Sequence, residues 1–304
     1  MVKMDTPTRE TPSLNFTAVY SFFLLMKPRV MSLVIFTGFS GIYLAPSGSH
    51  PLLAFISLLA IAAGAGASGA INQWYDRDID LIMTRTRERP IPSKQVQPAE
   101  ALAFGVTVSV LSVLILSLSA NLLSGALLAF TIIFYGLIYT VWLKRFTTQN
   151  IVIGGAAGAF PPIIGWAAVS GNVSLEAIIL FGLIFFWTPP HFWALSLVNI
   201  DDYKKANIPM LPVIYGADET RRQIMVYSVI MVFVSLLPCL VGMSHIFYGF
   251  IAGCSGALFL IFSVQLLKHQ DDKRAISLFR YSIMYLFILF LGLICDKAIQ
   301  ENII

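Results

Sequence analysis

Charged side chains crowd into one short stretch of an otherwise apolar chain, residues 72–90, which read NQWYDRDIDLIMTRTRERP. Within it, Asn72, Asp76 and Asp80 recur at every fourth position. If the preceding apolar segment continues as a helix through this stretch, the three side chains lie near one face, about 6 Å apart along the axis. This column of one amide and two carboxylates offers the oxygen ligands that Mg²⁺ prefers, and Mg²⁺ commonly bridges carboxylates to substrate phosphates.

The same stretch carries arginines suited to bind such phosphates. Arg85 and Arg89 are four residues apart, and a guanidinium group binds phosphate oxygens through two parallel hydrogen bonds. We interpret the stretch as a metal–diphosphate site. The alternative is an ordinary loop whose charges form surface ion pairs worth less than about 1 kcal/mol each. Asp78 would face the other side of the helix, so we expect it to pair with a cation rather than bind metal.

Two other polar segments add candidate residues. The segment NIDDYKKANIPMLP at 199–212 repeats the mixture of acids and bases, and YTVWLKRFTTQN at 139–150 adds Lys144 and Arg145. Each of the stretches 72–90 and 199–212 follows an apolar segment of helical length. The sequence therefore predicts two similar halves around a shared cavity, each with a polar loop after its second helix.

The rest of the chain is too apolar for a soluble protein. Hydrophobic residues make up 57% of the 304 positions and charged residues only 12%, against about 25% charged in soluble domains. A membrane-spanning helix needs roughly 20 apolar residues. Nine segments satisfy this length, near 28–46, 51–73, 99–119, 121–142, 150–170, 175–198, 222–242, 246–267 and 277–296. We expect an all-α polytopic membrane protein, with about nine transmembrane helices around a central intramembrane cavity and polar cap loops on the cytoplasmic side; continuous apolar runs argue against a β-barrel.

Charge asymmetry predicts the orientation. Of the 20 Lys and Arg residues, we place all except Lys297 on one face, which the positive-inside rule makes cytoplasmic. The N-terminus is then cytoplasmic and the C-terminus periplasmic. The short polar N-terminal segment lacks the apolar core of a signal peptide, which favours a bacterial inner membrane. The net charge of +4 reflects this face and does not indicate nucleic acid as a partner.

We expect three parts along the chain. Residues 1–27 form a polar cytoplasmic segment, 28–297 a single transmembrane domain, and 298–304 a short tail. Within the transmembrane domain we expect two repeated halves of four helices and a ninth helix.

The NxxxDxxxD spacing of residues 72–80 resembles the first aspartate motif of the UbiA-type intramembrane prenyltransferases. Further stretches resemble their haem branch, the protohaem IX farnesyltransferases or haem O synthases, so that the similarity extends over roughly 27–297. They are KPRVMSL (27–33), MTRTRERPIPS (83–93), YTVWLKRFTTQNIVIGGAAGAFPPIIGW (139–166), FWTPPHFWALSL (186–197) and DDYKKANIPMLPV (201–213). Many members of the wider family have a second DxxxD, whereas Leu197 and Val198 stand four residues before Asp201 and Asp202 here.

The resemblance implies transfer of a farnesyl group from farnesyl diphosphate to the 2-vinyl group of haem B, with water addition, giving haem O. Mg²⁺ is the implied cofactor, and haem B is a substrate. Asp76 and Asp80 would bind Mg²⁺, with Asn72 as ligand or orienting donor, and Asp201 and Asp202 are candidates for a second metal. The candidates for binding the diphosphate are Arg85, Arg89 and Lys144, and more weakly Arg29, Arg145, Lys204 and Lys205. Membrane lipid would surround the isoprenoid tail, and a haem A synthase or terminal-oxidase assembly would receive the product.

His191 stands inside an expected transmembrane segment, in TPPHFW. Ionisable residues within a membrane are commonly functional, and imidazole is a frequent axial ligand of haem iron. With the haem interpretation, we expect His191 to contact or ligate haem. The alternative is a packing histidine bonded to a backbone carbonyl that Pro189 or Pro190 leaves free.

Three other functions stay open at this point. One is a UbiA-type enzyme with a different aromatic acceptor, such as 4-hydroxybenzoate or a chlorophyll precursor, which would need no haem ligand. A second is a transporter or other non-catalytic haem-handling membrane protein, for which charges at the membrane midplane are typical. A third is an oxidase assembly factor, which would use His191 but not Asp76 or Asp80.

Overall fold

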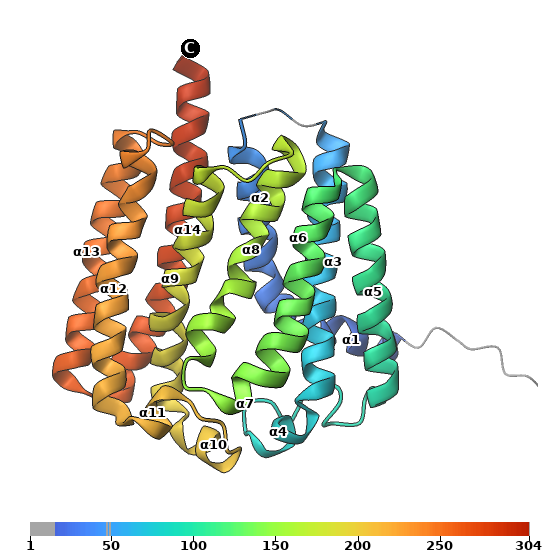
Figure 1. Cartoon of the computed structure of the whole chain (residues 1–304). Coiled ribbons are helices and arrows are strands. Elements are labelled where there is room, and N and C mark those ends of the chain that lie inside the picture. The colour runs from blue at the N-terminus through green and yellow to red at the C-terminus, as the bar shows by residue number, and fades with distance from the viewer. Residues whose placement is uncertain (1–15, 47, 49, 304) are drawn as a thin grey trace, which may run out of the picture.

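The computed structural model describes residues 16–46, 48 and 50–303, and every regular element in that part of the chain is a helix (Figure 1). Lys3, Arg9 and the remainder of the first fifteen residues lie outside the described residues. The helices are α1 (Phe16–Leu25), α2 (Pro28–Leu44), α3 (Pro51–Tyr75), α4 (Arg77–Ile82), α5 (Pro98–Ser119), α6 (Leu122–Ile133), η1 (Phe134–Leu143), α7 (Lys144–Phe146), α8 (Asn150–Ser170), α9 (Leu175–Val198), α10 (Ile200–Lys205), α11 (Leu211–Ile214), α12 (Gly216–Leu240), α13 (Ile246–His269) and α14 (Asp272–Ile303).

The described residues contain eight helices that are long and apolar enough to cross a membrane, or nine if the bent pair α1 and α2 is one span. That pair bends by 55°. The bend lies at Lys27, whose φ of 54° is left-handed, directly before Pro28 at the start of α2. The residues of α6, η1 and α7 form one continuous span, Leu122–Phe146. These elements confirm the prediction of an all-α polytopic membrane protein.

Two boundaries differ from those expected. Residues 16–25, within the segment expected to be polar, read FTAVYSFFLL and form α1. Residues 298–303, expected to be a tail, continue α14. In both places, apolar or helix-favouring residues add helix next to a span. A search for segments of about 20 apolar residues does not detect such additions.

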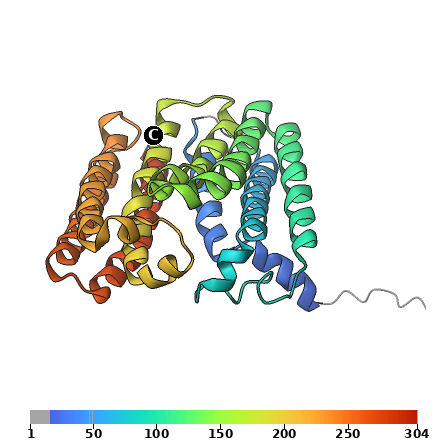
Figure 2. The same cartoon turned by 60° about the horizontal axis from the view of Figure 1, so that its bottom comes forward.

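The spans form an upright bundle in which α2 and α8 lie centrally (Figure 1). On one side of this pair, α3 packs against α5 and α5 against α6; on the other, α9, α12, α13 and α14 pack together. The short helices α4, α7, α10 and α11 gather at the end opposite the C-terminus, and Figure 2 shows this end turned toward the viewer. A short helix follows the second span of each half, α4 after α3 and α10 after α9. The repeat of two halves stays a prediction that this element order supports.

Helices α2 and α8 approach closely because both have glycine at the contact. A Cβ atom at Gly41 would lie 2.1 Å from the carbonyl oxygen of Pro162, and one at Gly165 would lie 2.3 Å from that of Gly38. Small residues at such positions let helix backbones meet within a membrane, where packing replaces the hydrophobic effect as the cause of association. This contact accounts for Gly165, which lies within the stretch 139–166.

Adjacent residues of α14 hold the ends of two other helices. The buried carboxylate of Asp296 accepts hydrogen bonds from the backbone N–H groups of His245 (2.9 Å) and Tyr248 (3.2 Å), where α13 begins. The ammonium group of Lys297 donates to the carbonyl oxygens of Tyr43 (2.8 Å) and Ala45 (3.0 Å), where α2 ends. Each side chain has the charge that complements the helix end it meets. This contact explains why Lys297 lies on the face opposite the other Lys and Arg residues.

We expect Asp296→Ala to lower the free energy of unfolding by about 1–3 kcal/mol, because it leaves the buried Tyr248 amide and the part-buried His245 amide without an acceptor. Denaturant titration of the detergent-solubilised protein measures this loss. Asp218→Ala is the matched control, since that carboxylate is exposed and pairs with Arg221 on the same helix, so its loss should stay below about 1 kcal/mol. Equal losses in the two variants would contradict the capping role.

Candidate active site at the polar end of the bundle

The end of α3 brings the three predicted residues of the aspartate motif into the protein interior. The helix is interrupted at Asp76, yet the hydrogen bonds from the Asp76 N–H to the Asn72 carbonyl (2.9 Å) and from the Asp80 N–H to the Asp76 carbonyl (2.8 Å) span the break. Exposure is 4% for Asn72, 0% for Asp76 and 1% for Asp80. The expected column thus forms across two helices instead of one, and its carboxylates are shielded from solvent.

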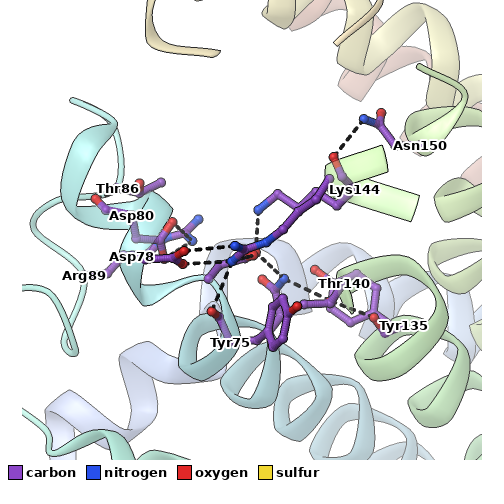
Figure 3. Close-up of polar contacts among 12 residues, drawn as sticks. Tyr75, Asp78, Asp80, Thr86, Arg89, Tyr135, Thr140, Lys144 and Asn150 are labelled. Atoms are coloured by element: carbon purple, nitrogen blue, oxygen red, sulfur yellow. Dashed lines mark hydrogen bonds and ion pairs between the residues drawn. The ribbon is translucent and has the colours of Figure 1, made fainter. Parts of the chain in front are cut away.

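Asn72 and Asp76 belong to one hydrogen-bond network, which they share with Thr140 and Lys144, two residues labelled in Figure 3. The Asn72 amide nitrogen donates to Asp76 Oδ2 (2.8 Å) and to Thr140 Oγ1 (3.1 Å), while its oxygen accepts from Lys27 Nζ (2.7 Å). Lys144 Nζ donates to the same Asp76 Oδ2. Three distant segments of the chain therefore meet at one buried carboxylate and its neighbouring amide.

Asp80 makes a separate ion pair. Arg89 Nη1 lies 3.0 Å from Asp80 Oδ1 and 2.8 Å from Oδ2, and Thr86 donates to the Asp80 backbone carbonyl (3.2 Å). These contacts fold the loop after α4 back onto the helix. Asp80 was expected to bind metal and Arg89 to bind phosphate, but in this structure the two side chains form an ion pair with each other.

Asp78 pairs with Arg145, as its place on the opposite helix face predicts. The two guanidinium nitrogens of Arg145 lie 2.9 and 2.8 Å from the Asp78 carboxylate oxygens. These bonds hold the pKa of the Asp78 carboxyl below its usual value. Arg145 also lies over the ring of Tyr75, 4.7 Å from its centroid. Its Nη2 stands 3.6 Å from Asp76 Oδ1, too far for a hydrogen bond.

A π-helical segment, η1, supplies the residues opposite α3. Wider helical turns of this kind are rare and often occur at functional sites. Thr140 Oγ1 donates to the carbonyl of Tyr135 (2.7 Å), and the rings of Tyr135 and Tyr139 stack with centroids 5.3 Å apart. Lys27 Nζ lies 5.7 Å from the Tyr135 ring centroid. The segment thus places two aromatic rings and a hydroxyl beside the charged network.

The second polar stretch contacts the first. Asp202 accepts hydrogen bonds from the Thr84 backbone N–H (3.0 Å) and hydroxyl (3.1 Å), which joins α10 to the loop after α4. Asp201 is exposed. Within residues 16–46, 48 and 50–303, no group of three or more His, Cys, Asp or Glu side chains is close enough to hold a metal. A second metal at Asp201 and Asp202 stays a prediction.

The chemistry of the first motif fits Mg²⁺ with two protein carboxylates. Asp76 Oδ1 is buried and without a hydrogen-bond partner among the described residues. An unsatisfied buried carboxylate oxygen is costly unless a ligand completes it. Two carboxylates alone give an open coordination shell, which is usual for Mg²⁺ that also binds substrate phosphates.

The remaining predicted phosphate residues do not join the buried network. The structure leaves Arg29, Arg85, Lys204 and Lys205 exposed. Sequence reasoning counted Lys27 only as a loop charge, although the structure gives it a direct contact with Asn72. The signal for it was its position, since a lysine before a proline at the start of an apolar span lies at the membrane boundary. A pocket of about 320 Å³ beside α9, α11 and α12 contains none of the predicted site residues.

His191 lies at the interface of α9 and α14, in the half of α9 that leads to the polar end. Its ring stacks on Trp187 (centroids 4.1 Å apart) and on Phe279 (4.6 Å). Its Nδ1 lies 2.7 Å from Ser282 Oγ, and that hydroxyl donates to the Phe279 carbonyl (2.6 Å). Because the hydroxyl has only one hydrogen and directs it to that carbonyl, we assign Nδ1 as the donor to the hydroxyl, which leaves a lone pair on Nε2 of the neutral ring.

The chain is similar in sequence to known prenyltransferases. The UbiA prenyltransferase family matches residues 33–291. Protoheme IX farnesyltransferase 2 of Mesorhizobium japonicum is 55% identical over 284 residues, covering 92% of this chain and 90% of its own. The protoheme IX farnesyltransferase of Rickettsia bellii is 55% identical over 276 residues, covering 90% and 92%. That of Agrobacterium fabrum is 51% identical over 296 residues, covering 96% and 93%.

Solved structures show the same fold. A digeranylgeranylglyceryl phosphate synthase aligns with a TM-score of 0.77 at 19% identity, over 92% of this chain and 98% of its own. A UbiA homologue from Archaeoglobus fulgidus bound to GPP and Mg²⁺ aligns with a TM-score of 0.65 at 15% identity, over 90% and 99%. The chain belongs to the UbiA prenyltransferase family and is a multi-pass membrane enzyme of that family.

Proposed function

We propose that this chain transfers the farnesyl group of farnesyl diphosphate to the 2-vinyl group of haem B, with addition of water, to give haem O for terminal oxidases. The observation that carries the proposal is the buried network of Asn72, Asp76 and Lys144, with Asp80 and Arg89 beside it. It lies in a chain that is 50–55% identical to relatives named protoheme IX farnesyltransferase. A diphosphate on a lipid-soluble tail fits this site, because its phosphates match the charged side chains and its tail matches the apolar bundle beside them.

Asp76 and Asp80 are the residues that would hold Mg²⁺, and Asn72 keeps the Asp76 carboxylate in place through its amide. When bound, Mg²⁺ supplies positive charge that stabilises the departing diphosphate. Lys144 and Arg89 are in reach of the same carboxylates and are therefore placed to bind phosphate oxygens. Arg85 would contact the phosphates from the rim, with Arg29, Arg145, Lys204 and Lys205 as weaker candidates, and a second Mg²⁺ would use Asp201 and Asp202.

The reaction joins carbon C1 of the farnesyl group to the terminal carbon of the haem vinyl group. The allylic C–O bond breaks and its electron pair leaves with the diphosphate. The vinyl π electrons form the new C–C bond, and water adds to the resulting cation, loses a proton and becomes the hydroxyl. The stacked rings of Tyr135 and Tyr139 border the charged network, where their π faces can stabilise a farnesyl cation.

His191 is the residue that we propose to contact haem. Its Nδ1–H is held by Ser282, which leaves Nε2 as the basic nitrogen. A ring nitrogen in this state is the usual metal ligand, and a hydrogen bond from the other nitrogen commonly fixes the ring. The partner of Nδ1 is a hydroxyl on α14. It is not a backbone carbonyl of α9 left free by Pro189 or Pro190, which the packing alternative expected.

The proposed setting is a bacterial inner membrane, with the polar end of the bundle and the N-terminus in the cytoplasm and the C-terminus in the periplasm. The distribution of Lys and Arg supports this orientation. A haem A synthase or a terminal-oxidase assembly would receive the haem O. A UbiA-type enzyme with another aromatic acceptor is the alternative; it would use Asp76 and Asp80 but not His191.

We expect Asp76→Asn to reduce farnesyl transfer on the order of 100-fold or more, because a neutral amide binds Mg²⁺ much more weakly than the carboxylate it replaces. The assay incubates purified protein with haem B, farnesyl diphosphate and Mg²⁺ and measures the mass of the haem product. Asp78→Asn is the matched control two residues away. Its side chain is 60% exposed, and it should keep most of the activity.

Two results would count against these assignments. Wild-type activity in Asp76→Asn would refute its metal role. Absence of any farnesylated haem with the intact wild-type protein would refute the proposed activity itself.

We expect His191→Ala to weaken haem B binding by about 10-fold or more and to change the absorption spectrum of bound haem, because an axial ligand is lost. Titration with haem B, followed by the Soret band, measures both effects. His269→Ala removes an exposed histidine at the end of α13 and should leave binding and spectrum unchanged. Unaltered haem binding and turnover in His191→Ala would leave only the packing role.

A further inference from the structure

The pocket of about 320 Å³ beside α9, α11 and α12 lies at the polar end of the bundle (Figure 1). The polar and aromatic side chains of its lining are one carboxylate, two amides and three aromatic rings, namely Glu219, Gln149, Gln223, Trp193, Tyr215 and Tyr227. Among the described residues that line it there is no Lys or Arg. We propose that this pocket binds the headgroup of a membrane phospholipid that carries an ammonium group, such as phosphatidylethanolamine. The pocket would take such a lipid whichever acceptor the enzyme prenylates.

Trp193 gives the pocket a hydrogen-bond donor without a partner. The residue is 1% exposed, and its indole Nε1 has no acceptor among the described residues. Its ring meets that of Tyr227 edge to face, with centroids 5.4 Å apart. A buried donor without an acceptor is costly, so an oxygen atom of a ligand in the pocket would stabilise it. A phospholipid has such oxygens in its phosphate and ester groups.

Glu219 gives the pocket a binding site for a cation. Its side chain is 39% exposed, and its Oε1 accepts a hydrogen bond from Gln223 Nε2 (2.8 Å). Its ion pair with Arg222 is long, 3.8 Å from Oε2 to Nη1, and the Arg222 side chain is 74% exposed. Such a pair is too long for a hydrogen bond and weak at a surface. A ligand ammonium group can therefore bind Oε2, with the nearby tyrosine rings as further partners for its charge.

The order of these groups along α12 matches the order of groups in the lipid. Glu219, Gln223 and Tyr227 follow one another at four-residue intervals, so Glu219 lies about 12 Å nearer the start of the helix than Tyr227. That start is at the polar end of the bundle (Figure 1). In an ethanolamine phospholipid the ammonium group is outermost and the phosphate, the esters and the acyl chains follow. The carboxylate is thus placed for the ammonium group, and Trp193, beside Tyr227, for the deeper oxygens.

The surroundings of the pocket favour a lipid over a soluble ligand. Tyr215 is exposed at the pocket and opens it to the surface, and tyrosine and tryptophan are typical of the membrane interface. Val226 and Phe233 lie within about 40° of Glu219 around the helix, and both are exposed. An acyl chain would lie along these two side chains. The carboxylate at the outer end disfavours anionic ligands, such as a diphosphate or the propionates of haem.

Native mass spectrometry of the full chain, released from detergent micelles, tests the cation site. It measures the binding of phosphatidylethanolamine and of phosphatidylglycerol with identical acyl chains. We expect the wild-type protein to bind the ethanolamine lipid about 10-fold more tightly, as one charge-assisted hydrogen bond supplies. Glu219→Gln should abolish this preference, because it keeps the size of the side chain and removes its charge. Asp218→Asn, the matched control, changes an exposed carboxylate outside the pocket that pairs with Arg221, and should keep the preference.

Trp193→Phe tests the second contact. It keeps an aromatic ring and removes the N–H group, so the affinity for both lipids should fall about 3- to 10-fold, because both contain phosphate and ester oxygens. Soluble phosphoethanolamine, titrated against the wild-type protein, should bind much more weakly than the lipid because it has no acyl chains.

The outcomes are distinct for each part of the proposal. Equal affinity of the wild-type protein for the two lipids, or an unchanged preference in Glu219→Gln, would overturn the ammonium site. Unchanged affinities in folded Trp193→Phe would overturn the indole contact. Phosphoethanolamine that binds as tightly as the lipid would overturn a lipid as the occupant. If Trp193→Phe does not fold, the comparison of Glu219→Gln with Asp218→Asn decides alone, since both replace partly or fully exposed side chains with ones of the same size.

Discussion

The ion pair between Asp76 and Lys144 is the interaction on which the rest of the site depends. A carboxylate shielded from water at a membrane boundary is tolerated only with a charged partner and further hydrogen bonds. Asp76 obtains these from Lys144 in α7 and from Asn72 on its own helix, and Asn72 is in turn bonded to Lys27 at the bend between α1 and α2. The need to satisfy one buried charge thus ties together segments of the chain that are far apart in sequence.

The sequence was sufficient for features that depend on local pattern. Apolar runs predicted the spans, and the four-residue spacing predicted that Asn72, Asp76 and Asp80 would share a side. Asp78 was likewise expected to pair with a cation, and it does. These predictions succeed because helical periodicity and the thickness of a bilayer constrain residues close together in the chain.

The contacts that complete the site were beyond such reasoning. The bonds of Lys27 with Asn72 and of Thr84 with Asp202 join residues 45 and 118 positions apart, and no local pattern specifies which helices meet. Nor did the sequence indicate the break at Asp76 or the π-helical turn at Thr140, because both depend on packing between helices. The mutual pairing of Arg89 with Asp80 was missed for another reason: each had been assigned to a ligand instead of to the other.

The paired caps made by Asp296 and Lys297 have a consequence for how large hydrophobic substrates enter the bundle. They fasten α14 to α13 and to α2 at the end that carries the C-terminus, so parting α2 from α14 at that end would leave the carbonyls of Tyr43 and Ala45 without their donor. Loss of a partner for a backbone carbonyl is costly in a membrane protein. A lateral opening between these two helices is therefore easier at the opposite end, which is also the end where the diphosphate network lies. The contact between α2 and α14 is thus fastened at one end, and a hydrophobic substrate that passed between these helices would do so nearer the polar end.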